Sequence, residues 1–190
     1  MLNIMIVYES MFGVTRQIAE AVERGARSVA GNRVSVTLRR VTEVQPEEVM
    51  DLDVLVVGAP THAHTMSRPE SRAEAAKWAS DPARRLRLEP DALESGVREF
   101  LPTLHPTDAD FVAFDTRVDA PEVFTGSAAR SIRRRLVKKG LEALLPAESF
   151  LVAKDGTLVD GEERRAEDLG RALVETARLT FPAAAALARV

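Results

Sequence analysis

The first thirty residues contain a continuous apolar run, a short loop with one glycine and a helical pattern in direct succession. The run covers Leu2–Tyr8, and a strand without polar alternation is typical of a sheet interior that is buried on both faces. The loop covers Ser10–Thr15. Apolar residues then recur at spacings of three or four from about Val14 to Val29, which predicts an amphipathic helix. A buried strand, a tight loop and a helix in this order favour an α/β fold.

The rest of the chain repeats this alternation of strands and helices. The predicted strands are Leu2–Tyr8, Arg33–Leu38, Val54–Ala59, Phe111–Phe114 and Ser149–Ala153. The predicted helical stretches are 14–29, 46–51, 70–80, 90–101, Ser127–Lys139 and Glu162–Leu179, with breaks at Asp81-Pro82 and at Pro102. Such an alternation predicts a mainly parallel sheet with helices on both faces. The second strand alternates apolar and polar residues, which indicates an edge position and favours the strand order 2-1-3-4-5.

Composition limits the classes of protein to consider. With 190 residues, we expect a single domain over 1–190. The chain has no cysteine, which excludes disulfides, iron–sulfur clusters and thiol catalysis. A net charge of −3 creates no field that attracts nucleic acid. No apolar stretch approaches the roughly 20 residues that a membrane span needs, and the start does not match a secretory signal. We therefore expect a cytoplasmic protein.

The loop Ser10–Thr15 has the chemistry of a phosphate cradle. The first-turn amides of a helix lack intrahelical partners and lie at the positive end of the helix dipole. Hydroxyl groups at both ends of the loop complete a site that suits an anion. The loop lacks the Gly-Lys-Ser/Thr of a Walker motif and the Gly-x-Gly-x-x-Gly of a dinucleotide fingerprint. The alternative is a plain strand–turn–helix in which Gly13 only makes the turn.

The three histidines do not indicate a metal site. His62 and His64 are two residues apart, so on an extended segment they point the same way and could form a zinc pair. A third ligand is not evident, and no metal is predicted.

Two segments resemble motifs of the flavodoxin-like family. Ser10-Met11-Phe12-Gly13-Val14-Thr15 resembles its phosphate loop, which reads roughly Ser/Thr-x-Thr-Gly-x-Thr, and Pro60-Thr61-His62 resembles its Pro-Thr-x pattern. The resemblance implies an α/β three-layer sandwich (α/β/α) with a five-stranded parallel sheet in the order 2-1-3-4-5. It also implies FMN at the switch between strands 1 and 3, a placement known for flavodoxin.

The resemblance assigns a role to three loop segments, which are Ser10–Thr15, Pro60–Ser67 and Asp115–Gly126. The first would hold the FMN phosphate, and the second and third would flank the flavin ring. The implied cofactor-binding residues are Ser10, Met11, Phe12, Gly13, Val14, Thr15, Pro60, Thr61, His62, Ala63, Asp115, Thr116 and Arg117. His62 and His64 are candidate proton donors, because a neutral-range pKa suits proton transfer.

The aromatic residues depart from the family pattern. Flavodoxins stack the ring between aromatic side chains of the second and third loops, whereas 60–67 contains none and the third loop offers only Phe124. The resemblance implies an FMN protein that acts in electron transfer or as a small NAD(P)H/quinone-type oxidoreductase. Its partners would be a redox protein, or NAD(P)H and a quinone-like molecule, and a homodimer is compatible with this. The alternative is a flavodoxin-like domain that has lost FMN and acts as a binding or regulatory module.

A phosphoryl-accepting receiver domain is a further rival with similar topology. It needs an acidic cluster after the first strand and an aspartate at the end of the third. Here the first strand is followed by Glu9 alone, and the third ends in Gly58-Ala59-Pro60.

Overall fold

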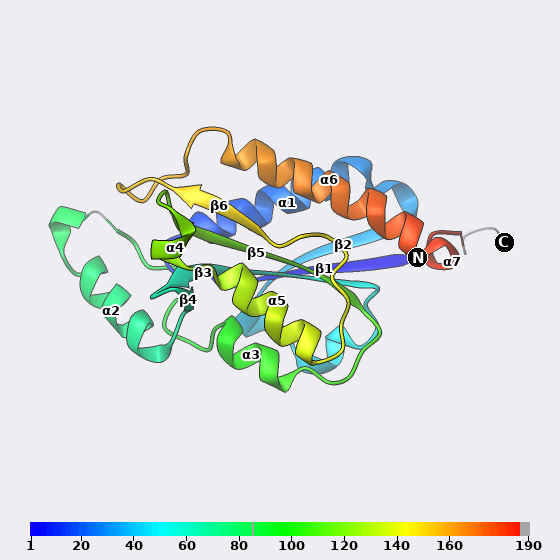
Figure 1. Ribbon diagram of the computed structural model, residues 1–190, viewed down its shortest axis with the longest axis horizontal. Coiled ribbons are helices and arrows are strands. Elements are labelled where there is room, and N and C mark those ends of the chain that lie inside the picture. The colour runs from blue at the N-terminus through cyan, green and yellow to red at the C-terminus, as the bar shows by residue number, and fades with distance from the viewer. Residues whose placement is uncertain (85, 187–190) are drawn as a thin grey trace.

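The computed structural model describes residues 1–84 and 86–186 and shows a sheet between two layers of helices (Figure 1). The strands are β1 (Leu2–Tyr8), β2 (Val34–Arg40), β3 (Val54–His62), β4 (Thr65–Met66), β5 (Asp110–Val118) and β6 (Glu148–Val152). The parallel strands follow the order β2-β1-β3-β5-β6, and the two-residue β4 pairs antiparallel with β3. The predicted order is therefore confirmed, with β4 as an addition.

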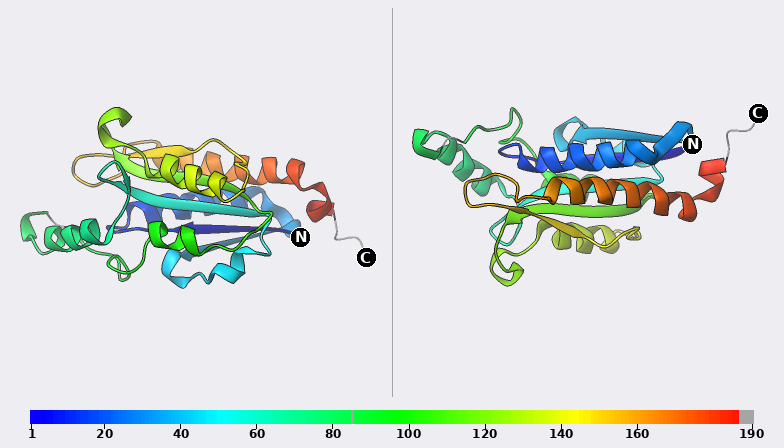
Figure 2. Two further views of the ribbon diagram at one scale, coloured as in Figure 1. Left: turned by 60° about the horizontal axis from the view of Figure 1, so that its bottom comes forward. Right: turned by 90° about the horizontal axis from the view of Figure 1, so that it is seen from above.

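The helices cover both faces of the sheet. They are α1 (Val14–Ala30), α2 (Pro69–Ala79), α3 (Val97–Thr103), α4 (Glu122–Thr125), α5 (Ala128–Lys138), α6 (Glu162–Thr180) and α7 (Pro182–Ala186), with short 3-10 turns at Gly31–Arg33, Val41–Glu43, Pro46–Val49 and Pro82–Arg84. α1 and α6 lie side by side over one face (Figure 2), and α3 and α5 cover the other. α2 projects beyond the carboxyl ends of the strands (Figure 1). No described helix is long and apolar enough to cross a membrane.

The helices α1 and α6 touch through glycine. A Cβ atom added at Gly25 would lie 2.0 Å from the carbonyl oxygen of Glu167, and one added at Gly170 would lie 2.0 Å from that of Val22. Real Cβ atoms do not approach backbone oxygen so closely, so each helix needs glycine where it meets the other. This contact sets how far α1, which follows the loop 10–15, lies from its neighbour.

Two strands are longer than the sequence indicates. β3 continues to His62, where a strand ending at Ala59 was expected, and β5 runs from Asp110 to Val118 instead of 111–114. The polar residues at these ends indicate loops, but the strands pair with each other up to Pro60 and Thr116. β3 is then extended further by its hairpin with β4. The expected loop 60–67 is thus largely strand and hairpin.

The connection between β4 and β5 also differs from the expectation. α2 and the break after it are as predicted, but residues 90–93 form turns and α3 begins only at Val97. Pro102 lies inside α3 instead of ending it. Proline removes the amide that would bond to the carbonyl oxygen four residues earlier. That oxygen, on Arg98, accepts a hydrogen bond of 3.2 Å from Nη1 of Arg135 instead, so the helix tolerates the proline.

Candidate functional site

The loop after β1 ends in a glycine that opens α1. Gly13 has φ +92°, in the left-handed region that favours glycine, and its amide donates to Oγ of Ser10 at 3.1 Å. α1 has no side-chain cap and no acidic residue in its first turn. The first turn of the helix therefore presents amides that no capping side chain satisfies, which is the arrangement that binds anions.

A threonine pair joins this loop to the end of β5. Oγ1 of Thr15 and Oγ1 of Thr116 share a hydrogen bond of 2.8 Å, and both residues are buried. The two residues are far apart in the sequence and belong to the first and third of the segments predicted to meet. The bond places the loop against the carboxyl end of β5.

Asp115 joins the second and third segments from inside the protein. Its buried carboxylate accepts hydrogen bonds at Oδ2 from Oγ1 of Thr61 at 3.0 Å, Oγ of Ser127 at 2.6 Å and the amide of Ala129 at 2.9 Å. Oγ1 of Thr61 also accepts the amide of Ala128 at 2.8 Å, and Oγ of Ser127 accepts that of Arg130 at 3.1 Å. The side chains of Asp115 and Thr61 thus cap α5, where a negative charge is favourable.

A cavity of about 210 Å³ lies where the second and third segments meet. It is lined by Thr61, Ala63, His64, Arg117, Val118, Phe124 and Thr125. Ala63 and His64 have φ angles of +45° and +69°, and the backbone of His64 bridges to that of Gly126. A Cβ at Gly126 would lie 2.2 Å from the carbonyl oxygen of His64, so this close approach requires glycine.

The two sides of this cavity have different chemistry. The Phe124 side chain is 71 % exposed and offers an aromatic face to solvent. Nη1 of Arg117 donates to the carbonyl oxygen of Ala120 at 2.6 Å, which holds a positive charge on the cavity wall. A flat ligand with a developing negative charge would suit both groups.

The two candidate proton donors have different positions. His64 is exposed and lines the cavity. His62 is half-buried at the end of β3, is not among the residues that line the cavity, and has its pKa lowered by burial. Because His64 lines the cavity and His62 does not, the geometry favours His64 of the two as a proton donor.

A buried cluster of Glu9, Ser67 and Arg72 next to the loop was not predicted from the sequence. Glu9 accepts hydrogen bonds from Oγ of Ser67 and, at 2.9 Å, from the amide of Val97. Nη1 of the buried Arg72 donates to Oγ of Ser67 at 2.9 Å and lies 3.2 Å from Oε2 of Glu99. Burial raises the pKa of Glu9, and these hydrogen bonds and Arg72 oppose the rise. The only sequence signal was an acid placed directly after a buried strand.

A second carboxylate lies on the outer side of the loop. The amide of Glu89 donates to the carbonyl oxygen of Met11 at 2.8 Å, and its side chain lies between two guanidinium groups. Nε of Arg16 is 3.2 Å and Nη2 of Arg40 is 3.3 Å from Oε2 of Glu89. A Cβ at Gly13 would lie 3.2 Å from Oε1 of Glu89. The segment between α2 and α3 therefore brings a negative charge to the phosphate-loop candidate.

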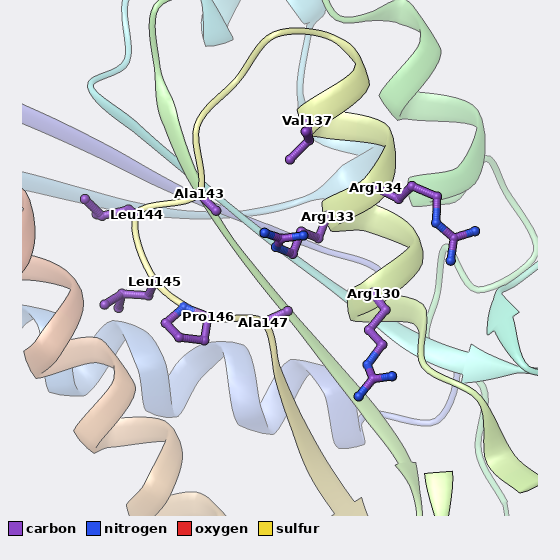
Figure 3. A pocket seen from close by; sticks show the side chains of 9 residues that line it. All are labelled: Arg130, Arg133, Arg134, Val137, Ala143, Leu144, Leu145, Pro146 and Ala147. Atoms are coloured by element: carbon purple, nitrogen blue, oxygen red, sulfur yellow. The ribbon is translucent and has the colours of Figure 1, made fainter. Parts of the chain in front are cut away.

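A larger cavity lies elsewhere, between α5 and the segment before β6 (Figure 3). Its volume is about 710 Å³, and it is lined by Arg130, Arg133, Arg134, Val137, Ala143, Leu144, Leu145, Pro146 and Ala147. None of the predicted site residues lines it. Across residues 1–84 and 86–186, no group of three or more potential ligand side chains could hold a metal ion.

Known proteins of similar sequence include flavodoxins and quinone dehydrogenases. A family model described as flavodoxin matches residues 6–95. A flavodoxin of Aquifex aeolicus is 37% identical over 65 residues, which is 34% of this chain and 34% of the relative. An NAD(P)H dehydrogenase (quinone) of Acidithiobacillus ferrooxidans is 42% identical over 62 residues, which is 33% of this chain and 28% of the relative. The chain thus matches about a third of these curated relatives or less.

Solved structures match over almost the whole chain. A flavodoxin from Archaea has a TM-score of 0.62 at 19% identity and covers 93% of this chain and 99% of its own. Flavodoxin 1 from Bacillus cereus has a TM-score of 0.62 at 15% identity and covers 91% of this chain and 97% of its own. At these identities, the likeness shows the fold.

Proposed function

We propose that this chain is a flavodoxin-like protein that binds FMN non-covalently and transfers electrons, because a flavodoxin family model matches residues 6–95 and solved flavodoxins share its fold. The proposal rests on the Thr15–Thr116 hydrogen bond. This bond connects the uncapped first turn of α1 to the end of β5. The hydrogen bond thus brings a loop suited to phosphate next to the end of β5, beside a cavity that Phe124 lines.

The residues present fit FMN. Ser10 and Thr15 carry the hydroxyls, and the amides of Met11–Thr15 complete the cradle. Phe124 and His64 border the cavity where a flat ring would lie, with Arg117 as its positive charge. Oγ1 of Thr61 and Oδ2 of Asp115 are engaged inside the protein, and Oδ1 of Asp115 is buried without a hydrogen-bond partner among the described residues, so the backbone groups of both residues are what remains for the ring. Glu89 brings a negative charge that opposes a phosphate at the loop.

When bound, the cofactor supplies one- or two-electron transfer, and the protein sets its position and electronics. Ser10 and Thr15 would orient the phosphate through their hydroxyls. Arg117 would stabilise negative charge that develops at the cavity. His64 is exposed to solvent at the same cavity and could exchange a proton there.

Thr15→Ala is expected to weaken FMN binding by about 1–3 kcal/mol, because a buried charged group loses one hydrogen bond. Titration of the apoprotein with FMN, followed by flavin fluorescence, measures this change. Thr180→Ala removes a threonine hydroxyl from the exposed end of α6 and serves as the control. Equal FMN affinity of the two variants would contradict the assignment of Thr15. Absence of FMN binding by the unaltered protein would favour the alternative of a binding or regulatory module.

A reductase activity is the second candidate, because the second loop lacks aromatic residues and leaves one side of the cavity open. Two relatives named NAD(P)H dehydrogenase (quinone) point the same way. We expect the FMN-loaded protein to oxidise NADH or NADPH and to reduce a quinone at steady state. His64→Ala should slow this turnover without loss of FMN, with His105→Ala as the control. Reduction by dithionite without turnover by either nucleotide would favour an electron carrier.

A further inference from the structure

Glu89 places a carboxylate at the loop where the proposed function requires a phosphate. We infer that Glu89 is an intramolecular competitor of the phosphate group, and that its side chain must leave Arg16 and Arg40 before a phosphorylated ligand binds tightly. The inference rests on the proposed function, because it concerns the same loop. It adds a residue that determines how strongly the site favours a phosphorylated ligand over its unphosphorylated counterpart.

Three contacts hold Glu89 at the loop. Its amide bonds to Met11, and its carboxylate lies within 3.3 Å of Arg16 in the first turn of α1 and of Arg40 at the end of β2. The Glu89 side chain is only 12% exposed, so solvent and salt screen this ion pair less than a surface pair. Oε1 also lies within contact distance of the position that a Cβ of Gly13 would take.

Asp91, two residues after Glu89, also holds this segment next to the loop. Oδ1 of Asp91 lies 3.7 Å from Nη1 of Arg40, and Oδ2 accepts a hydrogen bond of 2.9 Å from Oγ1 of Thr42. The segment is therefore attached to both the end of β2 and the loop after β1. Residues 86–89 have no regular secondary structure, and residues 90–93 form turns. Such a segment can move its side chains without disruption of a helix or strand.

The charges explain why the carboxylate competes. The loop 10–15 contains no lysine or arginine, so Arg16 and Arg40 are the cations that the structure places beside it. A guanidinium is always charged and binds phosphate and carboxylate with the same fork of donors. Nη1 of Arg16 pairs with Glu20, and Nη1 of Arg40 lies near Asp91. Glu89 holds Nε of Arg16 and Nη2 of Arg40, so these donors are not free for phosphate, and its own charge repels a dianion. Replacement by glutamine removes the charge and keeps the size of the side chain.

The decisive comparison uses FMN and riboflavin, which differ by the phosphate group. Apoprotein is titrated with each ligand at low salt, and the dissociation constants are compared for the unaltered chain, Glu89→Gln and the control Glu94→Gln. Glu94 lies exposed in the same segment and forms no ion pair that the structure records among the described residues. We expect Glu89→Gln to bind FMN roughly tenfold more tightly, because one repulsion between like charges is lost. Riboflavin affinity should not change, and the gain for FMN should shrink as salt is added.

The outcomes separate this inference from the proposed function. If all three proteins bind FMN with equal affinity, Glu89 is not a competitor, while the proposed cofactor site stands. An equal gain for riboflavin would also overturn the inference, because it would show an effect without the phosphate. If no protein binds either ligand while circular dichroism shows a native fold, the proposed function fails and the inference fails with it. Glu89→Ala is the second variant, and it should show the same preference for FMN.

Discussion

Asp115→Ala is expected to lower the free energy of unfolding by about 3 kcal/mol or more, because each unsatisfied buried donor costs about 1–3 kcal/mol. The substitution removes the acceptor of Thr61, Ser127 and the amide of Ala129 in one step. It also removes a negative charge from the positive end of α5. Urea unfolding, followed by circular dichroism, measures the midpoint and the slope that give this free energy.

Asp115→Asn is the matched control, because it keeps the shape and one acceptor oxygen but loses the charge. We expect a smaller loss than for alanine. The same substitutions should weaken FMN binding, since the network positions Thr61 and the start of α5 beside the cavity. An alanine variant as stable as the unaltered protein would show that the network does not hold the two strand ends and α5 together.

Gly170→Val is expected to cost about 3 kcal/mol, near the upper end for added volume in a packed interior. The new side chain would start 2.0 Å from the carbonyl oxygen of Val22, so α1 and α6 must move apart. Even Gly170→Ala should destabilise the protein. On an exposed helix, the same exchange stabilises by about 1 kcal/mol, because alanine has the higher helix propensity. For Gly170→Ala, the close contact with Val22 therefore predicts a loss of stability, whereas helix propensity predicts a gain.

Glu175→Val tests the propensity term alone, because Glu175 is exposed on the same helix. It should change the free energy of unfolding by less than about 1 kcal/mol. Thermal unfolding of the three variants decides between the two effects. A gain of stability in Gly170→Ala would mean that the two helices do not touch at this glycine.

Local patterns in the sequence predicted most of the fold. The continuous apolar run of β1 and the helical spacing of α1 depend on residues that are close in sequence, so the loop between them could be located without a structure. The next long helix was predicted to begin at Ser127 for the same reason, and the Ser127 hydroxyl caps this helix by accepting the amide of Arg130. The edge-like pattern of β2 indicated its place at the edge of the sheet, and the complete strand order was also implied by the family resemblance.

Tertiary structure alone decided which polar groups meet. β3 and β5 are longer than predicted because their polar ends pair with each other, and pairing between distant segments leaves no periodic signal. Thr15 meets Thr116, Asp115 turns inward to α5, and Glu89 reaches Arg16 across 73 residues of chain. The sequence by itself determined that a loop suited to phosphate opens the first helix, because strand and helix periods are local. The charges and hydroxyls around that loop depend on contacts between distant residues, which only the folded chain brings together.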